Sequence, residues 1–232
     1  MANESSSKCW YDNVCENKTD ECTTACIRYL EMLYLMDTSN IPKAKQTPVK
    51  LVPSDVDYDA FMHLAHIKDN IIEFTEKGYN LYIVSTTTGN GKTSWAIKLM
   101  LKYFNDVWAG NGFRPRGLFI HVPTLLLQLK DFNRYTDSLN EIKKLLPVVD
   151  LVIWDDIGSL GLTNYDMSQL LMYLDQRVLE EKANIFTGNL LDMDLMNALG
   201  VRIYSRVWNT SDKVIFHGKD RRGLDGTIAD NK

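Results

Sequence analysis

The sequence predicts an α/β fold built on a five-stranded parallel sheet that is covered by helices on both faces. The first observation behind it is an apolar run at 81–84, which passes through a small polar loop with glycines into a helical pattern near Lys92. The second is that four further β-rich runs follow, each separated from the next by a helical run. Strands that alternate with helices form parallel sheets with helices on both sides.

Hydrophobic periodicity sets the bounds of the predicted elements. An amphipathic helix starts at Tyr58 and ends at Gly78, since glycine is common just past a helix end. Residues 217–232, after the last strand, are too few for another helical subdomain. The strands are expected at 81–84, 118–122, 151–154, 184–187 and 213–216, and the later helices at 92–108, 123–132, 139–146, 166–182 and 192–208.

The composition is that of a globular protein with one sizeable domain. Of the 232 residues, 45% are hydrophobic and 24% are charged, as in ordinary soluble domains. No apolar run approaches a membrane span, and the N-terminus is polar rather than signal-like. We therefore expect a cytoplasmic protein with no membrane partner. The net charge of −4 means that any DNA binding must rest on local basic clusters.

Three segments are expected along the chain. Residues 1–37 hold the cysteines and a helix on which Ile27, Leu30 and Tyr34 form a stripe at helical spacing. That stripe is either a docking face for a partner or the packing face of a small core of its own. Residues 38–57 contain three prolines and several lysines without periodicity, which indicates a linker. Residues 58–232 form the α/β domain.

All four cysteines lie in the first 26 residues. In a reducing cytoplasm such a cluster favours metal over disulfides, and four thiolates suit a tetrahedral zinc site that orders a small segment. Their spacing differs from that of common zinc ribbons, so free thiols are an alternative and an iron–sulfur cluster a weaker one. His63 and His66 have no nearby cysteine or acidic pair, which favours exposed or hydrogen-bonded histidines. The predicted Zn²⁺ ligands are Cys9, Cys15, Cys22 and Cys26.

The loop after the first strand has the chemistry of a phosphate-binding loop. Its glycines let backbone N–H groups turn inward around a phosphate, and the helix N-terminus adds partial positive charge. Lys92 can reach the outer phosphates of a nucleotide, and the Thr93 hydroxyl can ligate Mg²⁺. Thr86 stands where such loops usually open with a glycine. The predicted nucleotide-binding residues are Thr88, Gly89, Asn90, Gly91, Lys92, Thr93 and Ser94.

Two adjacent acids end the third predicted strand. Asp155 can hold Mg²⁺ directly or through a water, and Asp156 can orient or deprotonate an attacking water. Such a pair before Gly158 also suits a helix cap or a turn. The single strand that intervenes between the loop and this pair favours the nucleotide site.

Further polar residues are expected at the same edge of the sheet. Asn189 follows the fourth strand, where its amide can hold the attacking water or the terminal phosphate; an ordinary turn asparagine is the alternative. Arg202 and Arg206 share one face of a helix, which either is solvated or projects into a neighbouring subunit's nucleotide site. A basic run at 218–222 follows the fifth strand.

Together these motifs resemble the DnaC/DnaI-type helicase loaders of bacteria and their phages, a branch of the AAA+ ATPases. The resemblance covers most of residues 58–222, and the combination is far more specific than any one motif. It rests on Gly-Asn-Gly-Lys-Thr at 89–93, Asp-Asp-Ile-Gly at 155–158, Thr-Gly-Asn at 187–189, Val-Arg-Ile-Tyr-Ser-Arg-Val at 201–207, Gly-Lys-Asp-Arg-Arg at 218–222 and the strand–helix segment 120–130.

The resemblance implies an AAA+ core without a C-terminal helical lid, with ATP and Mg²⁺ held between neighbouring subunits. It implies that Asn189 acts as sensor 1 and that Arg206, or alternatively Arg202, is an arginine finger acting in trans. It also implies a helicase-binding zinc domain at the N-terminus. Sensor 2 would be Arg222, or alternatively Arg221. The catalytic residues so implied are Lys92, Asp155, Asp156, Asn189, Arg206 and Arg222.

The function expected from this resemblance is ATP-dependent loading of a DnaB-type replicative helicase onto single-stranded DNA by a homo-oligomer. Hydrolysis is expected to be slow, because Asp156 is one methylene shorter than the glutamate usual in the family. The alternatives are an IstB-like transposition-associated ATPase, an ATP-gated adaptor that sequesters the helicase, and a small-molecule P-loop kinase. Candidate DNA contacts are Arg114, Arg116, Lys130, Arg134 and Tyr135.

Overall fold

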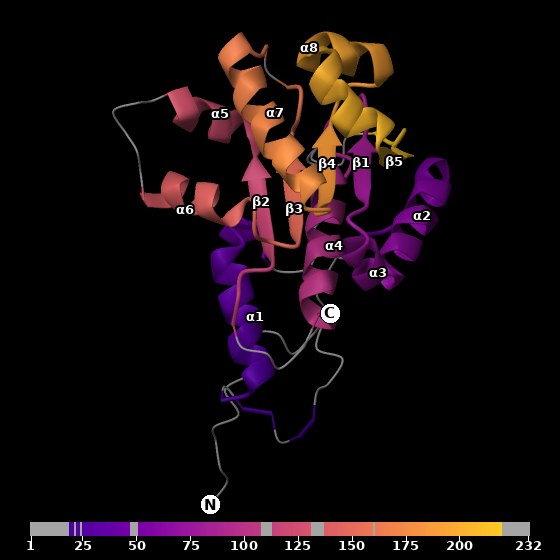
Figure 1. Cartoon of the computed structure of the whole chain (residues 1–232). Coiled ribbons are helices and arrows are strands. Elements are labelled where there is room, and N and C mark those ends of the chain that lie inside the picture. Colours follow the sequence, from indigo (N-terminus) through magenta and orange to yellow (C-terminus); the bar gives the residue numbers. More distant parts are fainter. Residues whose placement is uncertain are drawn as a thin grey trace, which may run out of the picture.

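The structure, a computed structural model, has a five-stranded parallel sheet at its centre (Figure 1). It describes residues 19–20, 22–23, 25–46, 51–107, 113–130, 137–159 and 161–219. The strands are β1 (Asn80–Val84), β2 (Gly117–His121), β3 (Leu151–Asp155), β4 (Ala183–Gly188) and β5 (Ser211–Ile215). Their order in the sheet is β2-β3-β4-β1-β5, so β4 lies between β1 and β3. The predicted fold class is confirmed, and every strand begins and ends within two residues of its predicted bounds.

Helices cover both faces of this sheet. They are α1 (Ile27–Thr38), α2 (Tyr58–Asp69), α3 (Ile71–Glu76), α4 (Lys92–Asp106), α5 (Val122–Lys130), α6 (Asp137–Leu145), α7 (Asn164–Leu179) and α8 (Asp192–Tyr204), with the short turns η1 (Lys43–Lys45), η2 (Asp55–Asp57) and η3 (Ser205–Asn209). Within the described ranges, no helix has both the length and the apolar character needed to cross a membrane.

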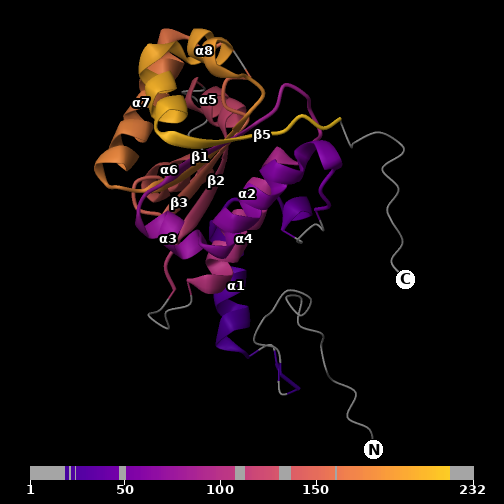
Figure 2. The same ribbon diagram turned by 90° about the vertical axis from the view of Figure 1, so that its right-hand side faces the viewer.

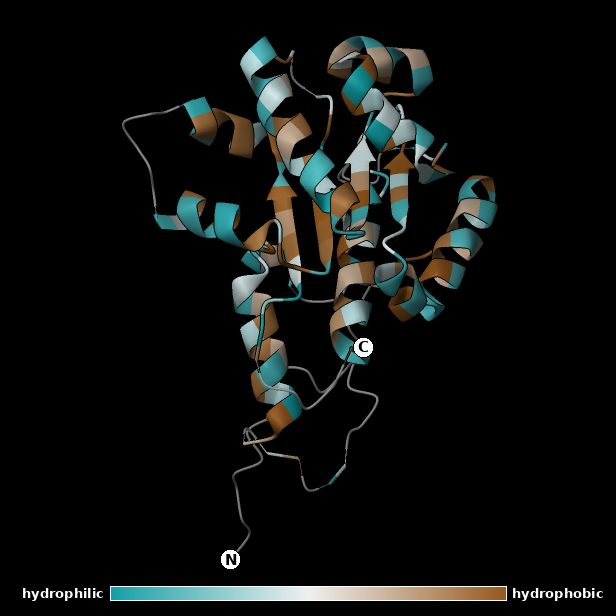
Figure 3. Ribbon diagram, viewed as in Figure 1, coloured by the Kyte–Doolittle hydropathy of each residue, from teal (hydrophilic) through white to brown (hydrophobic). Residues whose placement is uncertain are grey.

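Alternation along the strands divides the core into two layers. Successive strand residues point to opposite faces of a sheet. Leu81 and Ile83 accordingly pack in one cluster with α1–α4, whereas Tyr82 and Val84 pack in the other with α5–α8. Figure 2 shows the sheet between these helix layers, and Figure 3 shows that β2 and β3 are strongly hydrophobic. Such strands are typical of a sheet that is buried on both faces.

Two of the predicted helices are interrupted. Asn70, at φ −115° and ψ 27°, separates α2 from α3 within the helix expected from Tyr58 to Gly78. Gly200, at φ 74° and ψ 156°, breaks the helix expected at 192–208, which then ends in the π-helical turn η3. Glycine adopts a positive φ without a steric penalty. The prediction of continuous helices at these two places is therefore wrong.

Helix α1 packs on the α/β domain through a face that the sequence analysis missed. Met32, Leu35 and Met36 are buried in the same cluster as α4 and the sheet. Ile27 and Leu30, by contrast, are 62% and 42% exposed. Tyr34, the third residue of the predicted stripe, packs against that same cluster, so the stripe is not the packing face of a small separate core. Any truncation that tests the N-terminal segment has to stop before α1.

The predicted linker is tied to the edge of the sheet. Strand β2 is an edge strand, and an exposed edge is a site for unwanted pairing with other chains. Here the Phe119 backbone N–H donates to the Ser39 carbonyl at 2.7 Å, and the Asn40 amide donates to the Phe119 carbonyl at 3.0 Å. Residues 39–40 thus occupy part of the open side of β2.

A buried guanidinium organises the amino ends of β3 and β4. Arg177 of α7 is 0% exposed. Burial lowers the pKa of Arg177 to about 9, with Asp150 opposing that shift, so the side chain keeps its charge at neutral pH. Its donors reach the carbonyl oxygens of Leu146 (2.7 Å), Val149 (3.1 Å), Asp150 (3.4 Å) and Ala183 (2.7 Å), and Oδ1 of Asn184 (2.7 Å).

We predict that Arg177→Met lowers the free energy of unfolding by about 3 kcal/mol or more. The methionine fills most of the volume but leaves several buried acceptors without donors, each of which costs about 1–3 kcal/mol. Urea titration of the purified variant measures the change. Arg202→Met, at an exposed arginine, is the matched control and should unfold close to the parent midpoint. Equal midpoints for both variants would contradict this account of Arg177.

Candidate functional site

The loop between β1 and α4 has the backbone geometry of an anion cradle. Gly89 and Gly91 have φ of 71° and 96°, the left-handed region that favours glycine. Gly91 is also the N-cap residue of α4, so the unpaired N–H groups of that helix start at the loop. Thr86 is not among the residues with positive φ. A threonine at the opening of the loop therefore needs no strained backbone.

Side chains within the loop hold it closed. The Asn90 amide donates to the hydroxyls of Ser85 and, at 3.1 Å, Thr87. The Lys92 ammonium donates to the Thr87 carbonyl at 3.0 Å and to Oδ1 of Asn90 at 3.2 Å. The ammonium of Lys92 is thus held at the loop by neutral oxygens. Phosphate oxygens are stronger acceptors for such a donor.

One carboxylate oxygen joins the loop helix to two strands. Oδ1 of Asp155 accepts a hydrogen bond from the Thr93 hydroxyl at 2.7 Å and another from the Thr187 hydroxyl at 2.8 Å. Thr93 lies in the first turn of α4, Asp155 ends β3, and Thr187 lies near the end of β4. The structure thereby brings the two predicted Mg²⁺ ligands, Thr93 and Asp155, into direct contact.

The second acid has a strained backbone and a paired side chain. Asp156 has φ of 62°, a conformation that costs a non-glycine residue energy and is often found at functional sites. Its backbone N–H donates to the Thr187 hydroxyl at 3.1 Å. The Asn189 amide donates to Oδ1 of Asp156 at 3.4 Å. The structure thus places Asn189 beside Asp156, at the edge of the sheet that its position after the fourth strand predicts.

The residues present fit a nucleotide and a divalent cation. Oδ1 of Asn189 is buried and has no hydrogen-bond partner in the described structure, and buried polar atoms are usually paired. The donors of the loop and Lys92 suit phosphate oxygens. The oxygens of Thr93 and Asp155 are the ligand type that Mg²⁺ prefers.

The chain after β5 forms a further wall of the loop. The Thr87 hydroxyl donates to the Gly218 carbonyl at 2.7 Å. The backbone N–H groups of His217 and Gly218 donate to the buried Asp57 carboxylate at 2.6 and 3.1 Å. Asp57 belongs to the segment predicted as a linker, and it connects that segment to the phosphate loop through Gly218. No local sequence pattern marks this role of Asp57.

The two predicted finger arginines lie near the end of α8 and in η3. Arg206 forms an ion pair with Asp175 of α7, and Arg202 is exposed beyond the Gly200 break. Either arginine could still reach the nucleotide site of a neighbouring subunit. The arginine finger stays a prediction. Arg221 and Arg222 lie outside the described residues, so the sensor 2 assignment also stays a prediction.

The predicted zinc site falls mostly outside the described residues. Cys9 and Cys15 are not described, and Cys22 and Cys26 form no disulfide bond in the described structure. Among the described residues there is no group of three or more side chains able to hold a metal ion. The zinc site therefore stays a prediction.

Three of the candidate DNA contacts form ion pairs with carboxylates of their own chain. Arg114 and Arg116 lie 2.8 and 3.6 Å from Oδ2 of Asp150. Lys130 forms a 2.7 Å ion pair with the buried Asp166 of α7. Burial alone would raise the pKa of the Asp166 carboxyl. Hydrogen bonds from Lys130 and Thr163 outweigh this effect, so the pKa of Asp166 is lowered. Arg134 and Tyr135 lie outside the described residues.

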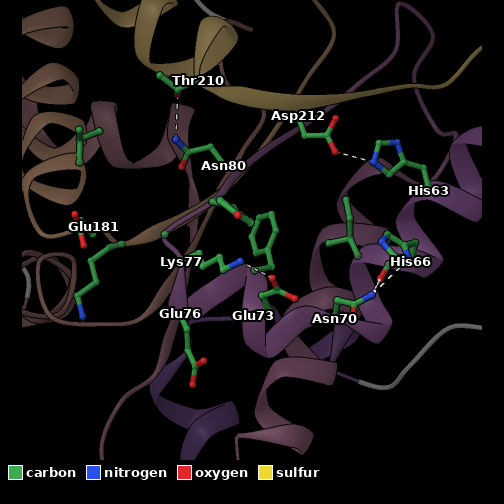
Figure 4. Close-up of a pocket in the computed structure, with 16 residues that line it drawn as sticks. His63, His66, Asn70, Glu73, Glu76, Lys77, Asn80, Glu181, Thr210 and Asp212 are labelled. Carbon is green, nitrogen blue, oxygen red and sulfur yellow. Dashed lines mark hydrogen bonds and ion pairs between the residues drawn. The ribbon is translucent and has the colours of Figure 1, made fainter.

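A large cavity lies at the other end of the molecule. It measures about 1180 Å³ and is lined from α2, α3, the end of α7 and the starts of β1 and β5 (Figure 4). His63 forms a 2.7 Å pair with Asp212 there, and His66 contacts Asn70. Neither histidine belongs to a group of metal ligands within the described ranges. None of the phosphate-loop residues lines this cavity.

Comparison with solved structures supports the fold. The crystal structure of the DnaC helicase loader matches with a TM-score of 0.58. Its sequence is 22% identical to this one, and the match covers 71% of this chain and 93% of that chain. The crystal structure of DnaI matches with a TM-score of 0.57 and 20% sequence identity, covering 76% of this chain and 95% of that chain. The structure of AMPPCP-bound DnaA from Aquifex aeolicus matches with a TM-score of 0.52 and 17% sequence identity, covering 73% of this chain and 50% of that chain. No family model and no curated protein matches the sequence. The predicted fold is thus confirmed, and this chain shares it with these solved structures.

We predict that Asp57→Ala lowers the free energy of unfolding by about 1–3 kcal/mol, because it leaves two backbone N–H groups at 217–218 without their acceptor. Asp59→Ala, at an exposed position of α2, is the matched control and should behave like the parent. Thermal and urea unfolding of the full chain measure both. A variant as stable as the Asp59 control would show that the 217–218 segment does not depend on Asp57.

Proposed function

We propose that this protein is an ATPase that loads a DnaB-type replicative helicase onto single-stranded DNA. The observation that carries the ATPase part is the direct contact of Thr93 with Asp155, beside the glycine loop that holds Lys92. Similarity to the solved DnaC helicase loader supports the loader part. The N-terminal cysteine segment, with zinc bound by its four thiolates, would bind the helicase.

The site residues divide the chemistry of phosphoryl transfer to water. The loop N–H groups and Lys92 bind the β- and γ-phosphates, and Thr93 and Asp155 hold Mg²⁺. When bound, Mg²⁺ neutralises charge that develops on the phosphate oxygens. Asp156 orients the attacking water and can accept its proton. Asn189, whose amide contacts Asp156, keeps its orphaned oxygen available for that water.

A second subunit completes the site. Arg206 of one protomer would stabilise the charge on the phosphates bound by its neighbour, as arginine fingers do. To do so, Arg206 has to exchange Asp175 of its own chain for the neighbouring nucleotide. This exchange makes hydrolysis depend on assembly, and it agrees with the slow basal turnover expected from the short Asp156 side chain.

We predict that Lys92→Ala weakens ATP binding about 10- to 100-fold, since hydrogen bonds to charged groups contribute about 1.5–3 kcal/mol. Fluorescence titration with a labelled ATP analogue measures the affinity. Lys98→Ala, farther along α4, is the matched control and should bind like the parent. Unchanged affinity in Lys92→Ala would overturn the assignment of the phosphate loop.

The loader part has its own readouts. Parent turnover should rise with protein concentration and with single-stranded DNA, and the full chain should co-purify with a replicative helicase. Replacing all four cysteines by serine should abolish the complex and leave ATP binding intact. An active ATPase that binds no replicative helicase and responds to double-stranded DNA would instead support the transposition-associated function.

A further inference from the structure

Thr187 contacts three consecutive residues at the acidic end of β3. Its hydroxyl donates to Oδ1 of Asp155 at 2.8 Å and accepts the Asp156 backbone N–H at 3.1 Å. Its carbonyl accepts the Ile157 backbone N–H at 2.8 Å. The residue is only 2% exposed. One threonine of β4 therefore fixes the turn on which both predicted catalytic carboxylates stand.

The two bonds to the hydroxyl determine the direction of its proton. A hydroxyl has a single proton to donate, and its lone pairs accept. Because a backbone N–H can only donate, the oxygen of Thr187 is the acceptor toward Asp156 and its proton goes to Asp155. Oδ1 of Asp155 also accepts the Thr93 hydroxyl. Two hydroxyls thus fix the rotation of the Asp155 carboxylate, and this rotation sets the position of its other oxygen, Oδ2.

The same contact supports a strained backbone. Asp156 is left-handed, with φ of 62°, and such a conformation persists only where its surroundings enforce it. The N–H groups of Asp156 and Ile157 both end on Thr187. Without the hydroxyl, the Asp156 N–H loses its acceptor and the turn loses one of its two ties to β4. The carboxylate of Asp156 would then shift from its place beside Asn189.

The position of β4 makes this arrangement possible. Thr187 pairs with Ile83 of β1, and the following Gly188 pairs with Val84 at the start of the phosphate loop. A Cβ at Gly188 would lie 2.4 Å from the Tyr82 hydroxyl and 2.9 Å from the Ile157 carbonyl. Only glycine fits there, which keeps Thr187 close to both the loop strand and β3.

We propose that Thr187 is a positioning residue for ATP hydrolysis, which sets the orientation of the Mg²⁺-binding Asp155 and of the water-orienting Asp156. The proposal rests on the ATPase function proposed above. Thr187 acts through the two aspartates, with which its hydroxyl forms hydrogen bonds. Its side chain therefore affects turnover and the Mg²⁺ requirement, while nucleotide affinity without metal depends on the loop and Lys92.

The test compares Thr187→Val, which keeps the shape and removes the hydroxyl, with Thr187→Ser, which keeps the hydroxyl. In the full chain, we expect Thr187→Val to lower kcat about 10- to 100-fold, since a misplacement of about 1 Å can cost on the order of 10²-fold. The Mg²⁺ concentration for half-maximal turnover should rise several-fold. Binding of labelled ATP in EDTA should stay within about twofold, and Thr187→Ser should restore most of the turnover.

A control separates positioning from loss of a buried hydroxyl as such. Thr75 of α3 is also buried and bonds the Ile71 carbonyl at 2.9 Å, and it lies outside the site. Thr75→Val should lose stability without a change in kcat or in Mg²⁺ dependence. If Thr187→Val does not fold, Thr187→Ala replaces it in the comparison with serine.

The outcomes are distinguishable. Parental kcat and Mg²⁺ dependence in Thr187→Val would overturn the positioning role and leave the ATPase function standing. A serine variant as impaired as the valine variant would overturn it too, because packing rather than the hydroxyl would then be responsible. A parent chain that binds no ATP would overturn the proposed function and, with it, the role of Thr187.

Discussion

The hydrogen bonds that converge on Oδ1 of Asp155 are the interaction on which the rest of the site depends. They join α4, β3 and β4 at a single oxygen. A carboxylate so held at the tip of a buried strand is fixed relative to the glycine loop, although β1 and β3 are not neighbours in the sheet. The strand between them, β4, therefore has to supply a small polar side chain at this level.

The two ends of the sheet have different physical tasks. At the amino end, Arg177 donates to backbone carbonyls of neighbouring segments, and the Asp150 carboxylate forms ion pairs with cationic side chains. At the carboxyl end, Asn189 keeps a buried oxygen without a partner and Asp156 keeps a strained backbone. An unpaired buried oxygen and a strained backbone thus lie side by side where a ligand is expected to bind, and other unpaired atoms and positive-φ residues occur elsewhere in the described structure.

The sequence predicted what local patterns control. Strands were predicted to within two residues because each is a short apolar run between polar turns. Lys92, Thr93 and Asp155 were proposed as site residues from their places at element ends. Contacts between distant segments were not predictable in this way. Thr187 lies 32 residues from the Asp155 that it bonds, and Asp57 lies 160 residues from His217. The packing face of α1 was missed because apolar residues occur on both its buried and its exposed sides.

The most direct test of the account is a crystal structure of the full chain grown with a non-hydrolysable ATP analogue and Mg²⁺. We expect the phosphates to lie in the 85–91 loop in contact with the Lys92 ammonium, and a metal ion to lie between the Thr93 hydroxyl and Asp155. A nucleotide found elsewhere on the molecule, or a loop that keeps Lys92 on the Thr87 carbonyl at saturating nucleotide, would contradict it.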